Sequence, residues 1–109
     1  MKDDGKVIRE QVLSWPGITD HPHRFGGREF LLGKREIGHI HGDDLVDIPL
    51  PTKVRNEVVA SGKAQPHHVL LDSGWVSLYL REPADVETAV ELLRLSYELA
   101  AKQRGLPAD

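Results

Sequence analysis

Residues 29–49 read EFLLGKREIGHIHGDDLVDIP and predict a meander of three β-strands. The strands are expected at 24–32, 35–41 and 45–49, since β-branched, aromatic and alternating apolar residues favour extended chain. Gly33-Lys34 and Gly42-Asp43-Asp44 supply the tight turns between them, and Pro49 ends the third strand. We read the Gly26-Gly27 pair ahead of the hairpin as a bulge or bend.

The rest of the chain predicts three helices and one further strand. Apolar residues at helical spacing predict helices over 4–14, 51–61 and 83–104, with Gly105 as the stop of the last helix. Residues 75–80, WVSLYL, predict a strand with apolar residues on both faces. The predicted order is α-β-β-β-α-β-α. The fold class is therefore α+β, with an antiparallel sheet and its helices packed on one face.

Composition limits the classes of protein that the chain can belong to. Its 109 residues, 39% hydrophobic and 28% charged, predict a single domain over 1–109. The absence of cysteine excludes disulfides, thiolate metal sites and cysteine nucleophiles. A net charge of -3 with both signs interspersed makes nucleic-acid binding unfavourable. No signal peptide or membrane span is recognisable, so we expect a cytoplasmic monomer or small homo-oligomer with no cofactor, which binds a small molecule or a protein.

Strand alternation predicts a group of chemically active side chains on the sheet face away from the helices. Aromatic rings supply stacking there, and imidazole, carboxylate and guanidinium groups supply orientation, as in many ligand sites. The candidate ligand-binding residues are Arg28, His39, His41, Asp47, Trp75 and Tyr79, with Ser77 on the same face and Arg24 as the alternative to Arg28. The other interpretation is an ordinary solvent face whose aromatic rings lie under a loop or a dimer partner.

The six histidines form three pairs, at 21 and 23, 39 and 41, and 67 and 68. Two imidazoles at i and i+2 on one strand face converge, so His39 and His41 are candidate ligands for zinc or another divalent metal. A third ligand could come from Asp47, His23 or His68. Structural hydrogen bonding is the alternative role for the same histidines.

Acid–base chemistry is a second use of these residues, because His39 or His41 beside Asp47 could form a general acid–base pair. Ser73 does not fit a nucleophile, since Asp72-Ser73-Gly74 precedes a strand and is ordinary turn sequence. Phe25-Gly26-Gly27-Arg28 lacks the glycine patterns of phosphate-binding loops.

Four segments resemble a small family labelled luciferase family or luciferase domain-containing proteins: HRFGGREF at 23–30, EIGHIHGD at 36–43, PHHVL at 66–70 and DSGWVS at 72–77. The resemblance extends from about Trp15 to Leu99. It implies neither light emission nor flavin, because flavin-dependent bacterial luciferases are TIM barrels of roughly 250 residues. The order of elements and the closing Leu-Ser-Tyr-Glu-Leu more distantly resemble MmcQ/YjbR-like domains, which implies a DNA-binding role by fold analogy.

Three functions follow as hypotheses. The first is a binding module that uses the open sheet face for a small ligand or a protein. The second is a small metal-dependent or acid–base enzyme that uses the paired histidines, and the third is a nucleic-acid-binding domain. Whether a reaction is catalysed stays open at this point.

Overall fold

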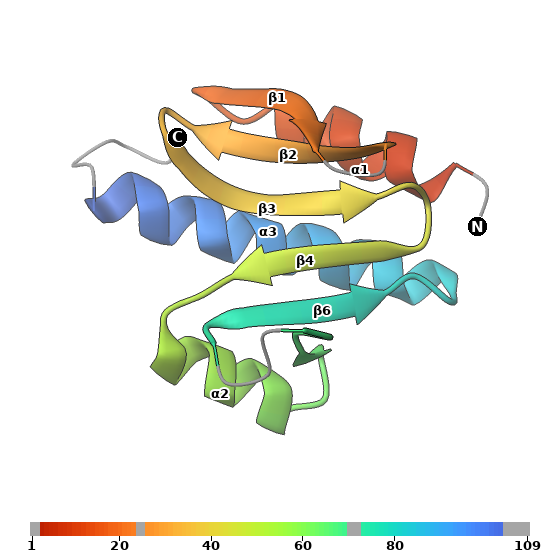
Figure 1. The fold of residues 1–109 in the computed structure, drawn as a ribbon, viewed down its shortest axis with the longest axis vertical. Helices are drawn as coiled ribbons and strands as arrows, with labels where there is room; N and C mark the ends of the chain where they lie inside the picture. Colours follow the sequence, from red (N-terminus) through yellow and green to blue (C-terminus); the bar gives the residue numbers. More distant parts are fainter. Residues whose placement is uncertain (1–2, 24–25, 70–72, 104–109) are drawn as a thin grey trace.

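One antiparallel sheet organises the molecule (Figure 1). The computed structural model describes residues 3–23, 26–69 and 73–103. Within them the strand order is β1-β2-β3-β4-β6-β5, and each strand pairs antiparallel with its neighbours. The strands are β1 (Ile18–His23), β2 (Gly27–Leu32), β3 (Arg35–His41), β4 (Leu45–Pro49), β5 (Gln65–Pro66) and β6 (Trp75–Tyr79).

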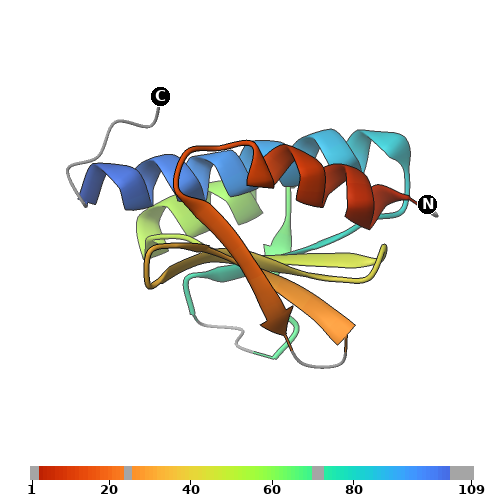
Figure 2. The same ribbon diagram turned by 90° about the horizontal axis from the view of Figure 1, so that it is seen from above.

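The helices lie on one side of this sheet (Figure 2). They are α1 (Asp4–Leu13), α2 (Thr52–Ala60) and α3 (Pro83–Gln103). α3 buries residues three or four positions apart, including Ala89, Leu93, Tyr97 and Ala100, against the sheet. Alternate strand residues complete the same core: Phe30, Ile40, Val46, Ile48, Val76 and Leu78. The predicted α+β class, with helices on one face, is confirmed. No helix in the described ranges is long and apolar enough to cross a membrane.

The predicted element order is incomplete, because β1 and β5 were not expected. Each of these strands contains a proline, Pro22 in β1 and Pro66 in β5, and both strands lie at the edges of the sheet. Proline cannot donate to a central ladder but is tolerated at an edge, so its presence hid both strands from sequence reasoning.

One predicted boundary differs from the structure, and another lies outside the described residues. The strand expected over 24–32 begins at Gly27, and Gly26, with φ +78°, belongs to the connection from β1. Arg24 lies outside the described residues, as do Arg104 and Gly105 at the predicted end of the last helix.

A register shift between β2 and β3 changes which side chains face away from the helices. Phe30 pairs with Gly38, whereas its neighbour Leu31 pairs with Glu36, so β3 contains one extra residue at this point. Arg35 reaches α3, where it hydrogen bonds to Gln103. Glu36 therefore points to the opposite face, which it shares with His39.

The close packing of α3 on β3 predicts the effect of enlarging Gly38. A Cβ there would overlap Leu93 Cδ2 and lie 3.0 Å from the carbonyl oxygen of Asp47. We expect Gly38→Ala to lower the free energy of unfolding by about 1–3 kcal/mol, since overpacking forces neighbours to shift. Urea denaturation measures the change.

The matched control is Glu87→Ala on the exposed side of α3, which should change stability by less than about 0.5 kcal/mol. Equal stability of Gly38→Ala and the parent protein would show that this contact is not tight.

Candidate functional site

Asp47 lies in the middle of the sheet, and its side chain has no exposed surface. Its neighbours across the two adjacent strands are His39 of β3 and Ser77 of β6. The Ser77 hydroxyl donates a 2.6 Å hydrogen bond to Asp47 Oδ1. A buried carboxylate is costly unless it is paired and hydrogen bonded, so the surrounding groups need to satisfy its second oxygen.

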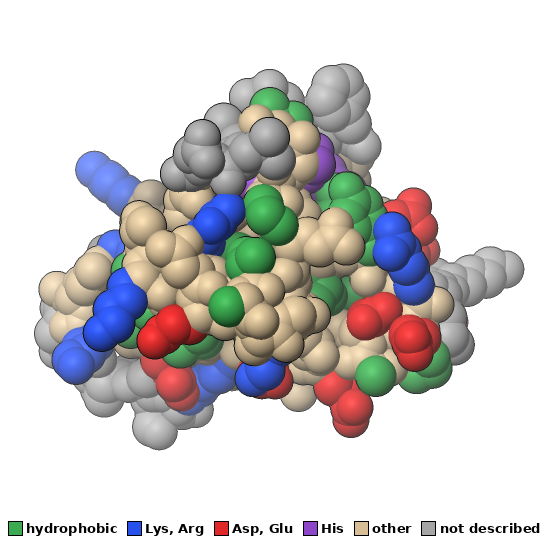
Figure 3. All heavy atoms as spheres, turned by 90° about the horizontal axis from the view of Figure 1, so that it is seen from below, with side chains coloured by type: hydrophobic (Ala, Val, Ile, Leu, Met, Phe, Trp, Pro, Cys, Tyr) green, Lys and Arg blue, Asp and Glu red, His purple; other side chains and the backbone are tan. Residues whose placement is uncertain are grey.

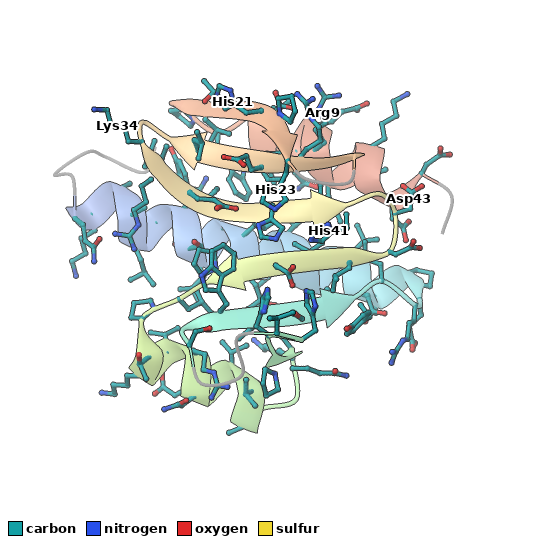
Figure 4. The ribbon with its side chains drawn as sticks, viewed as in Figure 1. Arg9, His21, His23, Lys34, His41 and Asp43 are labelled. Atoms are coloured by element: carbon teal, nitrogen blue, oxygen red, sulfur yellow. The ribbon has the colours of Figure 1, made fainter. Side chains whose placement is uncertain are left out.

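Four imidazoles converge on that second oxygen. The Nε2 atoms of His39, His41, His68 and His67 lie 3.1, 3.2, 3.3 and 3.6 Å from Asp47 Oδ2. His39 and His41 come from β3, whereas His67 and His68 belong to the connection between β5 and β6. We call these four histidines with Asp47 and Ser77 the Asp47 cluster. Figure 4 shows that His41 and the neighbouring His23 project from the face that bears no helix.

Carboxylates and a stacked ring orient the histidines from outside the Asp47 cluster. His39 Nδ1 lies 2.7 Å from Glu36 Oε2, and His23 Nδ1 lies 3.0 Å from Glu29 Oε1. The rings of His23 and His39 stack with their centroids 4.1 Å apart. Imidazoles that bind metals usually place their second nitrogen on such a carboxylate.

Trp75 and a backbone amide fix the buried side of the cluster. The Trp75 ring contacts His39 and His67, with centroid distances of 5.2 and 6.0 Å. The backbone N–H of Val69 donates to His67 Nδ1 at 3.1 Å. Because that nitrogen accepts a hydrogen bond, the proton of neutral His67 is on Nε2, which faces Asp47.

The cluster divides its histidines by charge. Burial disfavours the charged ring of His39, but the hydrogen bonds to Asp47 and Glu36 outweigh it and raise the pKa to about 9. Burial, followed by the charge of His39, lowers the pKa of His41, so its ring is neutral at pH 7. Burial also opposes ionisation of Asp47, yet hydrogen bonds from His39, Ser77 and His68 hold its pKa well below the usual range.

Solvent reaches the cluster from one side. The side chains of His68 and His41 are 37% and 28% exposed, compared with 10% for His39. Figure 3 shows only a small histidine area on the face seen from below, where basic and acidic side chains are interspersed. A small ligand can therefore approach His41 and His68 from solvent, whereas the Asp47 side chain has no exposed surface.

The predicted site residues do not all lie together. His39, His41, Asp47 and Trp75 meet in or beside the Asp47 cluster, as the alternation predicted. The Tyr79 ring packs instead under Arg81, 5.0 Å from its guanidinium carbon. Ser73 Oγ accepts a hydrogen bond from the Trp75 amide, which is a turn contact.

Arg28 does not lie on the same sheet face as the histidines, contrary to the prediction. Arg28 lies two and four residues from the buried Phe30 and Leu32 and therefore shares their face of β2. It hydrogen bonds to Asp20, which also binds Arg9 of α1. Arg28 therefore lies on the face that carries the helices.

Two cluster contacts were not anticipated from the sequence. Glu36 has the wrong parity to share a face with His39, and only the β2–β3 register shift brings it there. His67 lies in an irregular connection where no periodicity applies, and the histidine pair itself was its only signal. His23 and His68 were named as candidate third ligands, and both lie within the histidine group.

Among the residues that the structure describes, two sets of three side chains bring their ligand atoms within 4.8 Å of one another. The first set is His41, Asp47 and His68, and the second is His23, His39 and His41. Neutral imidazole and carboxylate are ligands of zinc and neighbouring divalent metals. The first set includes the fully buried carboxylate and the two most exposed histidines of the cluster, which suits a metal centre with an accessible position.

The fold and the cluster together define a small α+β domain with a histidine–carboxylate centre on the sheet face opposite its helices. The family model for the Luciferase domain matches residues 34–96, and the chain belongs to this family. The matched segment includes β3, β4 and β6 and thus the whole Asp47 cluster. Comparison with curated proteins gives no match, and comparison with solved structures gives none either.

The raised pKa of His39 predicts how stability depends on pH in metal-free protein. The folded-state pKa of about 9 exceeds the value of 6.5 of a free histidine, so the ion pair stabilises the fold fully below pH 6.5. This contribution is lost as pH rises from 6.5 through 9, and we expect the free energy of unfolding to fall by on the order of 1–3 kcal/mol. Urea denaturation at pH 6 and pH 9.5 measures it.

His39→Gln should remove most of this pH dependence, whereas His21→Gln on exposed β1 should leave it unchanged. An NMR titration that placed the His39 pKa near 6.5 would contradict the ion-pair assignment.

Proposed function

We propose that the protein is a small binding domain whose open sheet face holds one divalent transition-metal ion. The ligands are Asp47 Oδ2, His41 Nε2 and His68 Nε2, and one further position is left for a small exogenous ligand. The observation that supports this most strongly is the convergence of four imidazole nitrogens on one carboxylate oxygen.

Hydrogen bonding alone explains this convergence poorly. A carboxylate oxygen offers about two lone pairs as acceptor sites. His39 is charged between two carboxylates and donates one hydrogen bond to Asp47 Oδ2. His41 and His68 lie 3.2 and 3.3 Å from the same oxygen, and His67 Nε2 lies 3.6 Å from it. Three imidazole rings at hydrogen-bonding distance exceed the roughly two acceptor sites of this oxygen, and a shared cation would give His41 and His68 a common partner.

The distances also fit a metal polyhedron. Metal–nitrogen and metal–oxygen bonds of about 2.0–2.1 Å in a tetrahedral site place neighbouring ligand atoms roughly 3.3 Å apart. His41 Nε2 and His68 Nε2 lie 3.2 and 3.3 Å from Asp47 Oδ2. The depressed pKa of His41 keeps its ring neutral, as a metal ligand requires.

The remaining members of the cluster support the centre rather than bind the ion. Because Val69 occupies Nδ1 of His67, its Nε2 carries a proton and cannot coordinate. His39, held by Glu36, and the hydroxyl of Ser77 orient Asp47. With three protein ligands and an exposed side, the ion can polarise a bound group or a water molecule.

A second candidate function needs no metal. His41 is neutral, partly exposed and 3.2 Å from the ionised Asp47, which is the geometry of a general base oriented by a carboxylate. The two candidates differ in one measurable property, the affinity of the cluster for a metal.

Calorimetric titration of the 109-residue chain with Zn²⁺ tests the metal centre. We expect one ion per chain, because only one of the two sets found among the described residues contains Asp47. His68→Ala removes a partly exposed ligand and should weaken binding at least about tenfold without unfolding the protein. His21→Ala, an exposed histidine that contacts Thr19, is the matched control and should bind zinc as the parent does.

Asp47→Asn should abolish high-affinity binding, with circular dichroism as the check on folding. Failure of the parent protein to bind zinc would refute the metal centre and leave the His41–Asp47 pair. Equal zinc affinity in the parent and His68→Ala would assign the binding to adventitious surface histidines.

A further inference from the structure

A cavity lies on the helix-bearing side of the sheet, between α1 and the ends of β2 and β3. Its volume is about 220 Å³. Lys6 and Arg9 of α1, Arg28 of β2 and the turn residues Gly42 and Asp43 line it. This cavity shares no residue with the Asp47 cluster.

The two arginines are held together by one carboxylate. Arg9 Nε lies 2.6 Å from Asp20 Oδ2, and Arg28 contacts the same oxygen through Nε at 3.1 Å and Nη2 at 2.9 Å. A guanidinium has five N–H donors, so these contacts leave donors on both arginines for a ligand. Asp20 therefore positions the two guanidiniums side by side while neutralising only one of them.

The carboxylate that lines the cavity already has a structural role. Asp43 Oδ1 accepts the backbone N–H of Gly5 at 2.8 Å and so satisfies a free amide of the first turn of α1. The remaining cation, Lys6, is only 4.0 Å from Glu10, and both of these side chains are largely exposed. The cavity lining itself contributes three cations and one carboxylate, while Asp20 and Glu10 pair with those cations from beside the cavity.

We propose that this cavity binds a phosphate group, either as inorganic phosphate or as the monophosphate of a small molecule. Two preoriented guanidiniums and one ammonium suit a dianion with several acceptor oxygens better than a single carboxylate. The volume is below the roughly 300–1,000 Å³ of cavities for drug-sized ligands, which favours a small group. The glycines at 5, 26 and 42 add no side chains of their own to the cavity wall.

Calorimetric titration with inorganic phosphate tests the proposal on the 109-residue His68→Ala chain freed of metal by dialysis. This background separates the cavity from the proposed metal centre, where phosphate could also bind. Glycerol 3-phosphate provides the monophosphate arm, and acetate provides the monoanion control. We expect saturable binding of inorganic phosphate or glycerol 3-phosphate and at least about tenfold weaker binding of acetate.

Arg28→Gln should weaken phosphate binding about tenfold, since it removes a charged donor. Lys6→Gln changes an exposed side chain that the fold does not need, and it should weaken binding as well. Arg94→Gln on α3, paired with Glu98, is the matched control and should bind phosphate unchanged. Binding that is absent, or equal for acetate and phosphate, or insensitive to both variants would overturn the proposal.

Discussion

The arrangement of the open sheet face depends on one buried charge, the carboxylate of Asp47. Removing a carboxylate from water costs several kcal/mol of free energy, and interactions with its neighbours have to offset this cost. Ser77 and His39 do so from the adjacent strands because antiparallel pairing puts them directly opposite Asp47. The requirement extends outward, since the charge on His39 is itself buried among rings and needs Glu36. A chain of alternating charges therefore crosses the middle of the sheet.

That chain explains why the β2–β3 register shift matters for the site. Without the extra residue in β3, Glu36 would face α3, and His39 would have a single carboxylate partner. Gly38 occupies the shifted segment, where the absence of a side chain lets Leu93 of α3 pack against the strand. The register shift thus affects both faces of the sheet. On one face α3 packs closely against β3, and on the other Glu36 becomes a partner of the His39 imidazolium.

Period-two alternation predicted much of this site from sequence. Parity alone placed His39, His41, Asp47, Ser77 and Trp75 on one face, because β3, β4 and β6 are regular across those positions. The same rule, applied within β2, would have assigned Arg28 to the side of Phe30 and Leu32. The alternation rule could not predict the position of Glu36, because the register shift reverses its parity. It could not predict that of His67 either, because His67 lies in the irregular connection between β5 and β6. The edge strands β1 and β5, which contain proline, were not predicted for a related reason. Their pairing depends on their position in the sheet rather than on local composition.

The stability that the Asp47 cluster gives the fold could equally come from apolar residues at these positions. The core lies on the other face, between the sheet and the helices, and its residues are apolar. Well-packed hydrophobic residues in place of a buried ionic network commonly leave stability unchanged or increase it. The ion pair of His39 and Asp47 could be satisfied by Glu36 and Ser77 alone, without His41 and His68. These two partly exposed rings come from separate segments, and their convergence on one oxygen is the feature from which we propose that a further group binds there.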